Sequence, residues 1–444
     1  MRSFDRRIDL IGAEADGVEA LWRRIDVALP LYAQCWAAHI AFSSRSGAWG
    51  TVLMTILSGG KGKEWKAEHY ADVARLLAHC GAVESADVPS ALSAIAETIA
   101  ARDDAKTFAG AKPADAEAWL RTADSAIGER FGAFLERHGH RCVKEAELRE
   151  PSWASRPARY LVPALQAAVL ARLKQGGKTR AADSRGDDGA MPQLASTDVT
   201  RFGRFVLRQL LPTARRAVGQ REWGKSVSIA YHDGFKRAYR ELGERLAAEG
   251  LLADADLVFF CTHAELGLLC GASDARAAPP LAWIRGRAAL RRRVQPAFED
   301  LRFAEMSVGR PEPEAEASAC RADSAGATGS TPDAATTLRG MPVSHGVVEA
   351  RARVVRTLAD AAALESGEVM VAPHTDVGWT PCFTLVAGLV TELGGLLSHG
   401  AVVAREYGLP CVVGIANATA LVRDGDMVRL DGGAGTLTVL SRSG

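Results

Sequence analysis

The sequence predicts a multidomain protein in which a mostly α-helical N-terminal domain precedes a smaller C-terminal α/β domain. Three observations indicate this fold class. Residues 1–310 carry apolar side chains at helical spacing and show little of the alternation that is typical of strands. Residues 311–337 are rich in Ala, Ser, Thr, Pro and Glu, as flexible linkers are. Residues 338–444 contain short apolar runs separated by Gly, Asp and Pro, the pattern of strands joined by turns.

Several segments of the N-terminal region have apolar residues that recur every three or four positions, the period of an amphipathic helix. They are residues 18–29, 70–78, 90–100, 204–212 and 235–246. The short apolar run Asp256–Cys261 is compatible with a strand or with the beginning of a helix. Residues 175–190 are polar and rich in glycine, so we expect a mobile loop there within the helical domain.

The C-terminal region contains one alternating segment and several short buried runs, all of which we expect to be strands. They are residues 347–355, 368–372, 388–391, 411–413, 427–430 and 436–440. The region has the size of an ordinary compact domain.

The bulk composition is that of a globular protein and excludes some classes of partner. The chain has 444 residues and a net charge of +1, so no overall electrostatic attraction favours nucleic acid or an anionic membrane. It has no apolar run of membrane-spanning length, and its first residues lack the apolar core of a secretory signal. The eight cysteines are scattered without metal-binding spacing, so we expect free thiols, a cytoplasmic location and no metal site.

The most informative residues surround His399. Gly394 and Gly395 permit a backbone turn and the close approach of a bulky anion, and Ser398 is a good N-cap for a helix that continues through the following apolar stretch. A helix N-terminus presents free N–H groups that suit phosphate, and Arg405 could add a bidentate phosphate contact. A neutral imidazole is a nucleophile near pH 7. An isolated Ser-His pair is more often an ordinary helix start, but this combination predicts a histidine that carries a phosphoryl group.

A second group of charged residues stands in the helical region. If the segment is helical, Arg221 and Lys225 lie on one face, four residues apart, with Glu222 beside them. Two cations can hold a phosphoryl group and neutralise the charge that develops in its transfer. The carboxylate could accept the proton of an attacking hydroxyl. The same pattern in isolation usually marks a solvated helix face with salt bridges.

The ordered run from Gly394 to Gly414, with His399 and Arg405 inside it, resembles the swivelling phosphohistidine domain of PEP-utilising enzymes. That group includes phosphoenolpyruvate synthase, pyruvate phosphate dikinase, the first enzyme of the sugar phosphotransferase system and rifampicin phosphotransferase. The resemblance implies a β/β/α swivelling domain at residues 338–444 and transient phosphorylation of His399. It also implies that the Thr-Asp-x-x-Trp-Thr-Pro segment, which contains Asp376 and Thr380, shapes the wall beside the phosphohistidine.

The helical region is similar to the middle domain of the rifampicin phosphotransferase branch over residues 214–226 and 251–266. In that branch an Arg-Glu-x-x-Lys segment lies at the acceptor site, which implies this place for Arg221, Glu222 and Lys225. A Gly-His-Arg element of the same domain implies that His140 and Arg141 line the site, although a structural role for them is equally compatible. The resemblance thus makes residues 1–310 an acceptor- or substrate-binding domain.

The sequence lacks the family's Gly-rich phosphate loop, its ATP-grasp region and its PEP/pyruvate barrel. We therefore expect a separate ATP-grasp partner that binds ATP and Mg²⁺ and phosphorylates His399. The C-terminal domain would then swing on the 311–337 linker and deliver the phosphoryl group to a small hydroxylated acceptor. Two alternatives stay open: the C-terminal part of a longer synthase-like protein or antibiotic kinase, or a degenerate relative that only binds a small molecule or a partner.

Overall fold

A computed structural model describes most of the chain. The described residues are 9–12, 17–60, 62, 64–78, 84–122, 125–174, 194, 199–272, 280–299, 301, 303, 307–313, 336–357 and 360–443. The loop predicted at 175–190 lies outside the described residues, and so does most of the linker predicted at 311–337. Neither prediction is therefore tested.

The chain forms two compact units. The first comprises Met1–Arg6, Leu31–Asp233 and Ala334–Gly444, and the second comprises Arg7–Pro30 and Gly234–Asp333. The C-terminal α/β region thus shares a unit with a large part of the helical region. The domain boundaries at 310 and 338 stay a prediction.

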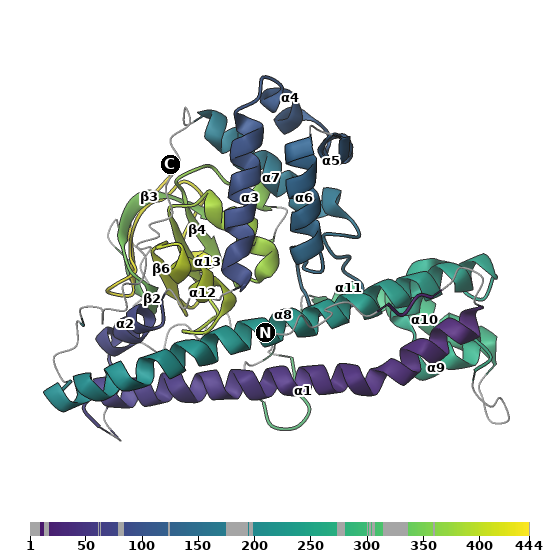
Figure 1. The fold of residues 1–444 in the computed structure, drawn as a ribbon, viewed down its shortest axis with the longest axis horizontal. Helices are drawn as coiled ribbons and strands as arrows, with labels where there is room; N and C mark the ends of the chain where they lie inside the picture. Colours follow the sequence, from purple (N-terminus) through teal and green to yellow (C-terminus); the bar gives the residue numbers. More distant parts are fainter. Residues whose placement is uncertain are drawn as a thin grey trace. The chain divides into compact units, whose positions relative to one another are not determined.

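Most of the N-terminal region is helical, as the fold class predicts (Figure 1). Two long helices, α1 (Val18–Leu57) and α8 (Arg201–Ala248), contribute residues to both units. The segments predicted at 204–212 and 235–246 belong to one continuous helix, α8, which contains Pro212. An internal proline costs a helix one hydrogen bond, and burial of apolar residues on both sides of it, such as Leu211 and Ala214, offsets that loss here.

Six shorter helices precede α8 in the first unit; α2 packs with α1 and α8, and the other five form a bundle with its own core. The six are α2 (Ala67–Leu76), α3 (Glu84–Ala100), α4 (Ala105–Gly110), α5 (Pro113–Thr122), α6 (Ser125–His138) and α7 (Pro157–Lys174). Helices α3 to α7 pack around large buried side chains that include Phe108, Phe131, Phe134 and Trp153. The segment that joins α6 to α7, residues 139–156, passes along this core and carries part of the site described below.

The second unit contains η1 (Ala255–Phe260), α9 (His263–Leu269), α10 (Leu281–Val294) and α11 (Pro296–Glu299). The apolar run at 256–261 is therefore mostly a 3₁₀ helix, capped by the Asp254 side chain, and not a strand. Arg291 of α10 forms an ion pair with Glu265 of α9 at 2.6 Å.

Among the described residues, eight strands form one mixed sheet in the order β1-β8-β7-β3-β4-β5-β6-β2. The strands are β1 (Thr337–Arg339), β2 (Met341–Ser344), β3 (Val347–Val354), β4 (Val369–Ala372), β5 (Gly388–Thr391), β6 (Cys411–Val413), β7 (Met427–Asp431) and β8 (Thr436–Ser441). Strands β3 to β6 are parallel neighbours, and antiparallel strands complete both edges. The six strands predicted from the sequence are confirmed, whereas β1 and β2 were not predicted.

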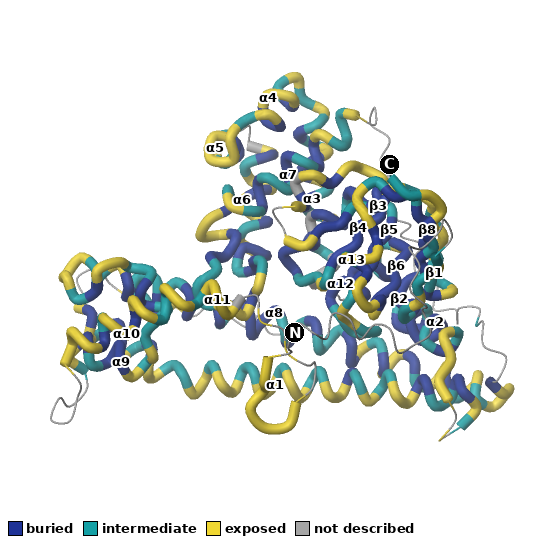
Figure 2. Tube along the Cα trace, turned by 180° about the vertical axis from the view of Figure 1, so that it is seen from behind, coloured by how far each residue is buried: buried dark blue, intermediate teal, exposed yellow. Residues whose placement is uncertain are grey.

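Both faces of the sheet are buried at the central strands β4, β5 and β6, which Figure 2 shows in dark blue. Alternate residues of each strand enter two separate cores. Met370 and Leu389 pack with helix α12 (His399–Glu406) and the 3₁₀ helix η5 (Val377–Thr384), whereas Val371 and Val390 pack with α13 (Ala418–Leu421). This double burial explains why the strands read as continuous apolar runs.

The sheet domain contacts the helices of the first unit through η5, the residue that follows it and the turn before α12. Val377 and Leu385 enter the core of helices α3 to α7, and Leu396 and Leu397 pack against the cluster formed by α1, α2 and α8. These contacts bring the N-terminus of α12 against the helical bundle. Among the described residues, no helix is long and apolar enough to cross a membrane.

Candidate functional site

A glycine turn leads into the helix that carries the central histidine, His399. Gly394 has φ of 140°, a backbone conformation that residues other than glycine rarely adopt. A Cβ at this position would lie 3.0 Å from Ser398 Oγ. Ser398 occupies the N-cap position, as predicted, but its hydroxyl donates to the Gly395 carbonyl at 2.9 Å and does not cap the helix. Because the Ser398 hydroxyl is used within the glycine turn, Ser398 does not cap the N–H groups at the start of α12.

His399 is the first residue of α12 and is 8 % exposed. Its Nε2 lies 2.9 Å from Thr380 Oγ1, and its Nδ1 is buried with no hydrogen-bond partner among the described residues. Burial holds the pKa of His399 well below its usual value, and the cation of Lys225 lowers it further. The imidazole is therefore neutral near pH 7, the form that acts as a nucleophile.

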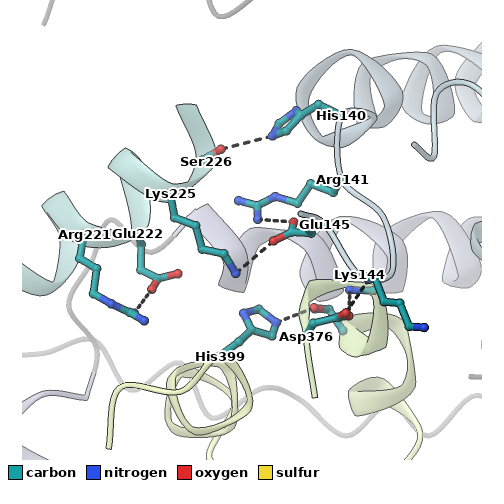
Figure 3. Close-up of polar contacts among 12 residues, drawn as sticks. His140, Arg141, Lys144, Glu145, Arg221, Glu222, Lys225, Ser226, Asp376 and His399 are labelled. Carbon is teal, nitrogen blue, oxygen red and sulfur yellow. Dashed lines mark hydrogen bonds and ion pairs between the residues drawn. The ribbon is translucent and has the colours of Figure 1, made fainter. Parts of the chain in front are cut away.

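A cluster of charged side chains from the helical region faces this imidazole (Figure 3). Lys225 of α8 places its Nζ 3.0 Å from Glu145 Oε2, and Arg141 places its Nη1 3.1 Å from Glu145 Oε1. One turn before Lys225 on α8, Arg221 forms an ion pair with Glu222. The structure therefore brings the predicted residues Arg221, Lys225 and Arg141 together with His399.

Glu145 was not predicted, and it is the residue that links two of the cations. Its side chain is 5 % exposed, and despite burial, which alone would raise the value, the charges of Lys225 and Arg141 lower its pKa to about 2. The carboxylate is thus ionised at every physiological pH. The sequence signal is weak, because a glutamate four residues after an arginine is a common surface pair.

Asp376 joins the sheet domain to the helical region at the same place. Its Oδ2 accepts the backbone N–H of Lys144 at 2.7 Å, and its Oδ1 accepts the backbone N–H of Gly378 at 2.8 Å. Burial raises the pKa of this carboxyl, and the nearby charge of Glu145 also raises it. Asp376 therefore supports the wall beside His399, which agrees with the expectation from its motif.

Two other predicted residues have different surroundings. His140 points toward α8, where its Nε2 lies 3.4 Å from Ser226 Oγ (Figure 3). Arg405 is buried in α12, and its Nη1 donates to the carbonyl of Val343 on β2 at 3.3 Å. A phosphate contact of Arg405 stays a prediction.

An aromatic cluster lies close to the same cations and was also missed by sequence reasoning. The Tyr32 hydroxyl lies 2.6 Å from His232 Nδ1, and the indole of Trp36 meets the rings of Tyr32, His39 and His232 edge-on. Burial lowers the pKa of His39, and the charges of Arg221 and Lys225 lower it further, which places His39 beside the cations. The Nε1 of Trp36 and the Nδ1 of His39 are buried without a partner among the described residues.

The described part of the chain contains no group of three or more His, Cys, Asp or Glu side chains arranged to hold a metal ion. What it does contain is a neutral, buried imidazole that lies within the electrostatic influence of Lys225, Arg141 and Arg221. This arrangement suits the reception and release of an anionic group at His399.

Comparison with known families divides the chain at the same regions. Residues 39–222 match the family described as the rifampicin phosphotransferase fourth domain, and residues 364–435 match the PEP-utilising enzyme mobile domain. The first match includes His39, Arg141, Glu145, Arg221 and Glu222, whereas Tyr32 and Trp36 of the aromatic cluster lie before its first residue. The second contains His399 and Asp376.

Individual proteins show the same relationship. The chain is 34 % identical over 321 residues to a rifampicin phosphotransferase of Streptomyces sviceus, which covers 70 % of this chain and 34 % of that protein. It is 53 % identical over 100 residues to a rifampicin phosphotransferase of Bacillus subtilis, covering 22 % of this chain and 11 % of that protein. It is 32 % identical over 319 residues to the prodigiosin synthesizing transferase PigC of Serratia marcescens, covering 70 % of this chain and 33 % of that protein. The chain spans about a third of the length of the curated relatives that it matches most broadly.

Proposed function

Since this chain is a relative of the rifampicin phosphotransferases and contains the mobile domain of PEP-utilising enzymes, we propose that it is a phosphotransferase component whose His399 is transiently phosphorylated. The observation that carries the proposal is the neutral imidazole of His399, buried against the cations of Lys225, Arg141 and Arg221. A phosphoryl group on that imidazole would enter a site that already holds the opposite charge.

The charging step needs a phosphoryl donor. In this proposal a separate ATP-grasp protein binds ATP and Mg²⁺ and supplies the phosphoryl group. A neutral nitrogen of His399 attacks the phosphorus, a phosphorus–nitrogen bond forms, and the bond to the donor oxygen breaks. The alternative, that an ATP-grasp region belongs to a longer form of the same chain, uses the same chemistry at His399.

The transfer step takes place in the described arrangement, with the sheet domain docked against the helical bundle. An acceptor hydroxyl attacks the phosphorus, the phosphorus–nitrogen bond breaks, and the electron pair returns to the imidazole. Lys225 and Arg221 stabilise the charge on the phosphoryl oxygens, and each such contact is worth ~3 kcal/mol, or about a hundredfold in rate. Glu222, which Arg221 holds on α8, is proposed to receive the hydroxyl proton.

Delivery from the donor to the acceptor requires movement of the sheet domain. Because His399 is buried in the docked arrangement, a donor protein has no access to it there. We propose that residues 338–444 swing on the segment 311–337 between charging and transfer, which lets each step proceed with water excluded.

The acceptor is proposed to be a small hydroxylated molecule with an aromatic or other apolar part. Tyr32, Trp36 and His39 offer ring surfaces next to Arg221 and Lys225, and aromatic side chains bind flat apolar groups well. Two relatives are named for the phosphorylation of rifampicin, so rifampicin is the first acceptor to test.

The labelling experiment uses the full chain, a candidate ATP-grasp partner and ATP labelled at the β- or γ-phosphate. Acid-labile, base-stable label on the chain, lost in His399→Ala, supports the proposal. His374→Ala is the matched control, because His374 is exposed in the same domain and should leave labelling unchanged. Label that persists in His399→Ala, or no label with the cognate partner, would contradict the proposal and favour the degenerate binding relative.

A further inference from the structure

Glu145 is buried between two cations at the point where the histidine domain docks. One carboxylate oxygen contacts Lys225 Nζ at 3.0 Å and the other contacts Arg141 Nη1 at 3.1 Å. Arg141 is 1 % exposed and Glu145 is 5 % exposed, so neither charge is solvated. A buried ion network of this kind adds little net stability compared with apolar side chains of the same volume. Stability alone therefore gives a weak reason for its presence.

The ion network and the imidazole of His399 each have one buried polar atom whose hydrogen-bonding capacity is unused. The Nε–H of Arg141 is buried without a partner among the described residues, and so is Nδ1 of His399. A buried donor without an acceptor costs about 1–3 kcal/mol, and the oxygens of a phosphoryl group are acceptors. The unmatched donor points to an anion as the missing partner.

The net charge of the cluster also suits an anion that binds only transiently. Arg221 and Glu222 neutralise each other, and Glu145 neutralises one of its two cations, so the triad of Arg141, Glu145 and Lys225 retains one positive charge. Without Glu145 two bare cations would face the neutral imidazole, which is costly in a buried site. With Glu145 present, a dianionic phosphoryl group must compete for Lys225 and Arg141, so it is attracted but held less firmly.

We propose that Glu145 is a positioning residue for phosphoryl transfer, which holds Lys225 and Arg141 beside His399 and competes with the phosphoryl group for them. This inference rests on the proposed phosphorylation of His399. When the unphosphorylated domain docks, Glu145 balances the cations. When the phosphorylated domain docks, Lys225 turns from the carboxylate to a phosphoryl oxygen, and it returns to Glu145 after the transfer.

The test is a ³¹P NMR titration of the full chain, charged at His399 with phosphoramidate so that no protein partner or acceptor is needed. The quantity measured is the pKa of the phosphoryl group. The charged and titratable groups around that position are Arg141, Glu145, Arg221, Glu222, Lys225, Asp376 and His39. Removing a negative charge favours the dianion, so Glu145→Gln should lower the phosphoryl pKa by roughly one unit, and Lys225→Met should raise it.

Glu147→Gln is the matched control, because Glu147 is exposed in the same α6–α7 segment and should leave the phosphoryl pKa unchanged. Since Glu145 acts partly through Lys225, its effect should shrink in the Lys225→Met background. If Glu145→Gln fails to fold, Glu145→Asp, which withdraws the carboxylate from Lys225, should give a smaller shift of the same sign. The inference is overturned if the phosphoryl pKa does not change in a folded Glu145 variant, or if the Glu145 and Lys225 effects simply add.

Failure of the proposed function gives a different result. In that case phosphoramidate yields no ³¹P signal that depends on His399, in the unaltered chain as in His399→Ala. If the signal depends on His399 but its pKa is the same in the Glu145 variants, the proposed phosphorylation of His399 is supported and the proposed role of Glu145 is wrong.

Discussion

The histidine turn and the cationic cluster that faces it are built in opposite ways. Residues 394–405 are contiguous, and their turn, helix start and nucleophile are all local features. The cluster is assembled from the α6–α7 segment and from α8, about 80 residues apart in sequence (Arg141 and Glu145 against Lys225). In the proposed function the two regions have separable roles: the turn and helix around His399 carry the phosphoryl group, and the cationic cluster stabilises its transfer to an acceptor.

The largest effect that tests this separation is expected from Lys225→Ala. The variant should be labelled at His399 as fully as the unaltered chain, because in the proposed function charging takes place away from the cluster. Transfer to an acceptor such as rifampicin should slow by about a hundredfold or more, since a cation is lost from the transfer site. Labelling and transfer are measured separately from the same labelled chain, and a loss of labelling would show that the two regions are not separable.

The buried carboxylate of the cluster predicts a pH dependence of stability. The pKa of Glu145 is lowered from 4.5 to about 2, so its contribution is present above pH 4.5 and is lost as the pH falls toward 2. The contribution is on the order of 3 kcal/mol. Urea unfolding between pH 5 and pH 3 should therefore show a shallower loss of stability in Glu145→Gln than in Glu147→Gln. Equal slopes would mean that the ion network is not formed in solution.

Addition of one methyl group at Gly394, in the turn that precedes His399, should destabilise the protein. Gly394→Ala places a Cβ at φ of 140° and 3.0 Å from Ser398 Oγ, and we expect a loss of roughly 1–3 kcal/mol and impaired labelling of His399. Gly395→Ala is the control, because its Cβ would meet nothing within 4 Å. Denaturant unfolding compares the two variants, phosphoryl labelling is measured for Gly394→Ala, and an equal loss of stability in both would disprove the strained turn.

The smallest effect is expected at the aromatic cluster. Trp36→Leu should raise the KM for an aromatic acceptor roughly fivefold, or about 1 kcal/mol, and leave the labelling of His399 intact. Steady-state transfer with rifampicin measures this, with Trp65→Leu as the control. An unchanged KM for an acceptor that is otherwise turned over would place the acceptor away from Trp36.

The same difference between local and assembled features decides what the sequence could predict. The six strands between residues 347 and 440 and the turn at Gly394 are each determined by a short run of neighbouring residues, so the sequence predicts them. Arg221 and Lys225 were found because one helical turn relates them. Glu145 and His39 were missed, because only the packing of α1, α6–α7 and α8 places them at His399 and at the cations. Strands β1 and β2 were missed because an edge strand of three or four residues gives little periodic signal.

The contact between Asp376 and Lys144 affects which substitutions related sequences can carry at position 144. The Asp376 carboxylate accepts the backbone N–H of Lys144, so this hydrogen bond does not depend on the side chain at position 144. Lys144 has φ of 51°, which glycine and asparagine tolerate best and which proline cannot adopt. Related chains can therefore keep this contact with a different side chain at position 144, provided that the residue tolerates a positive φ.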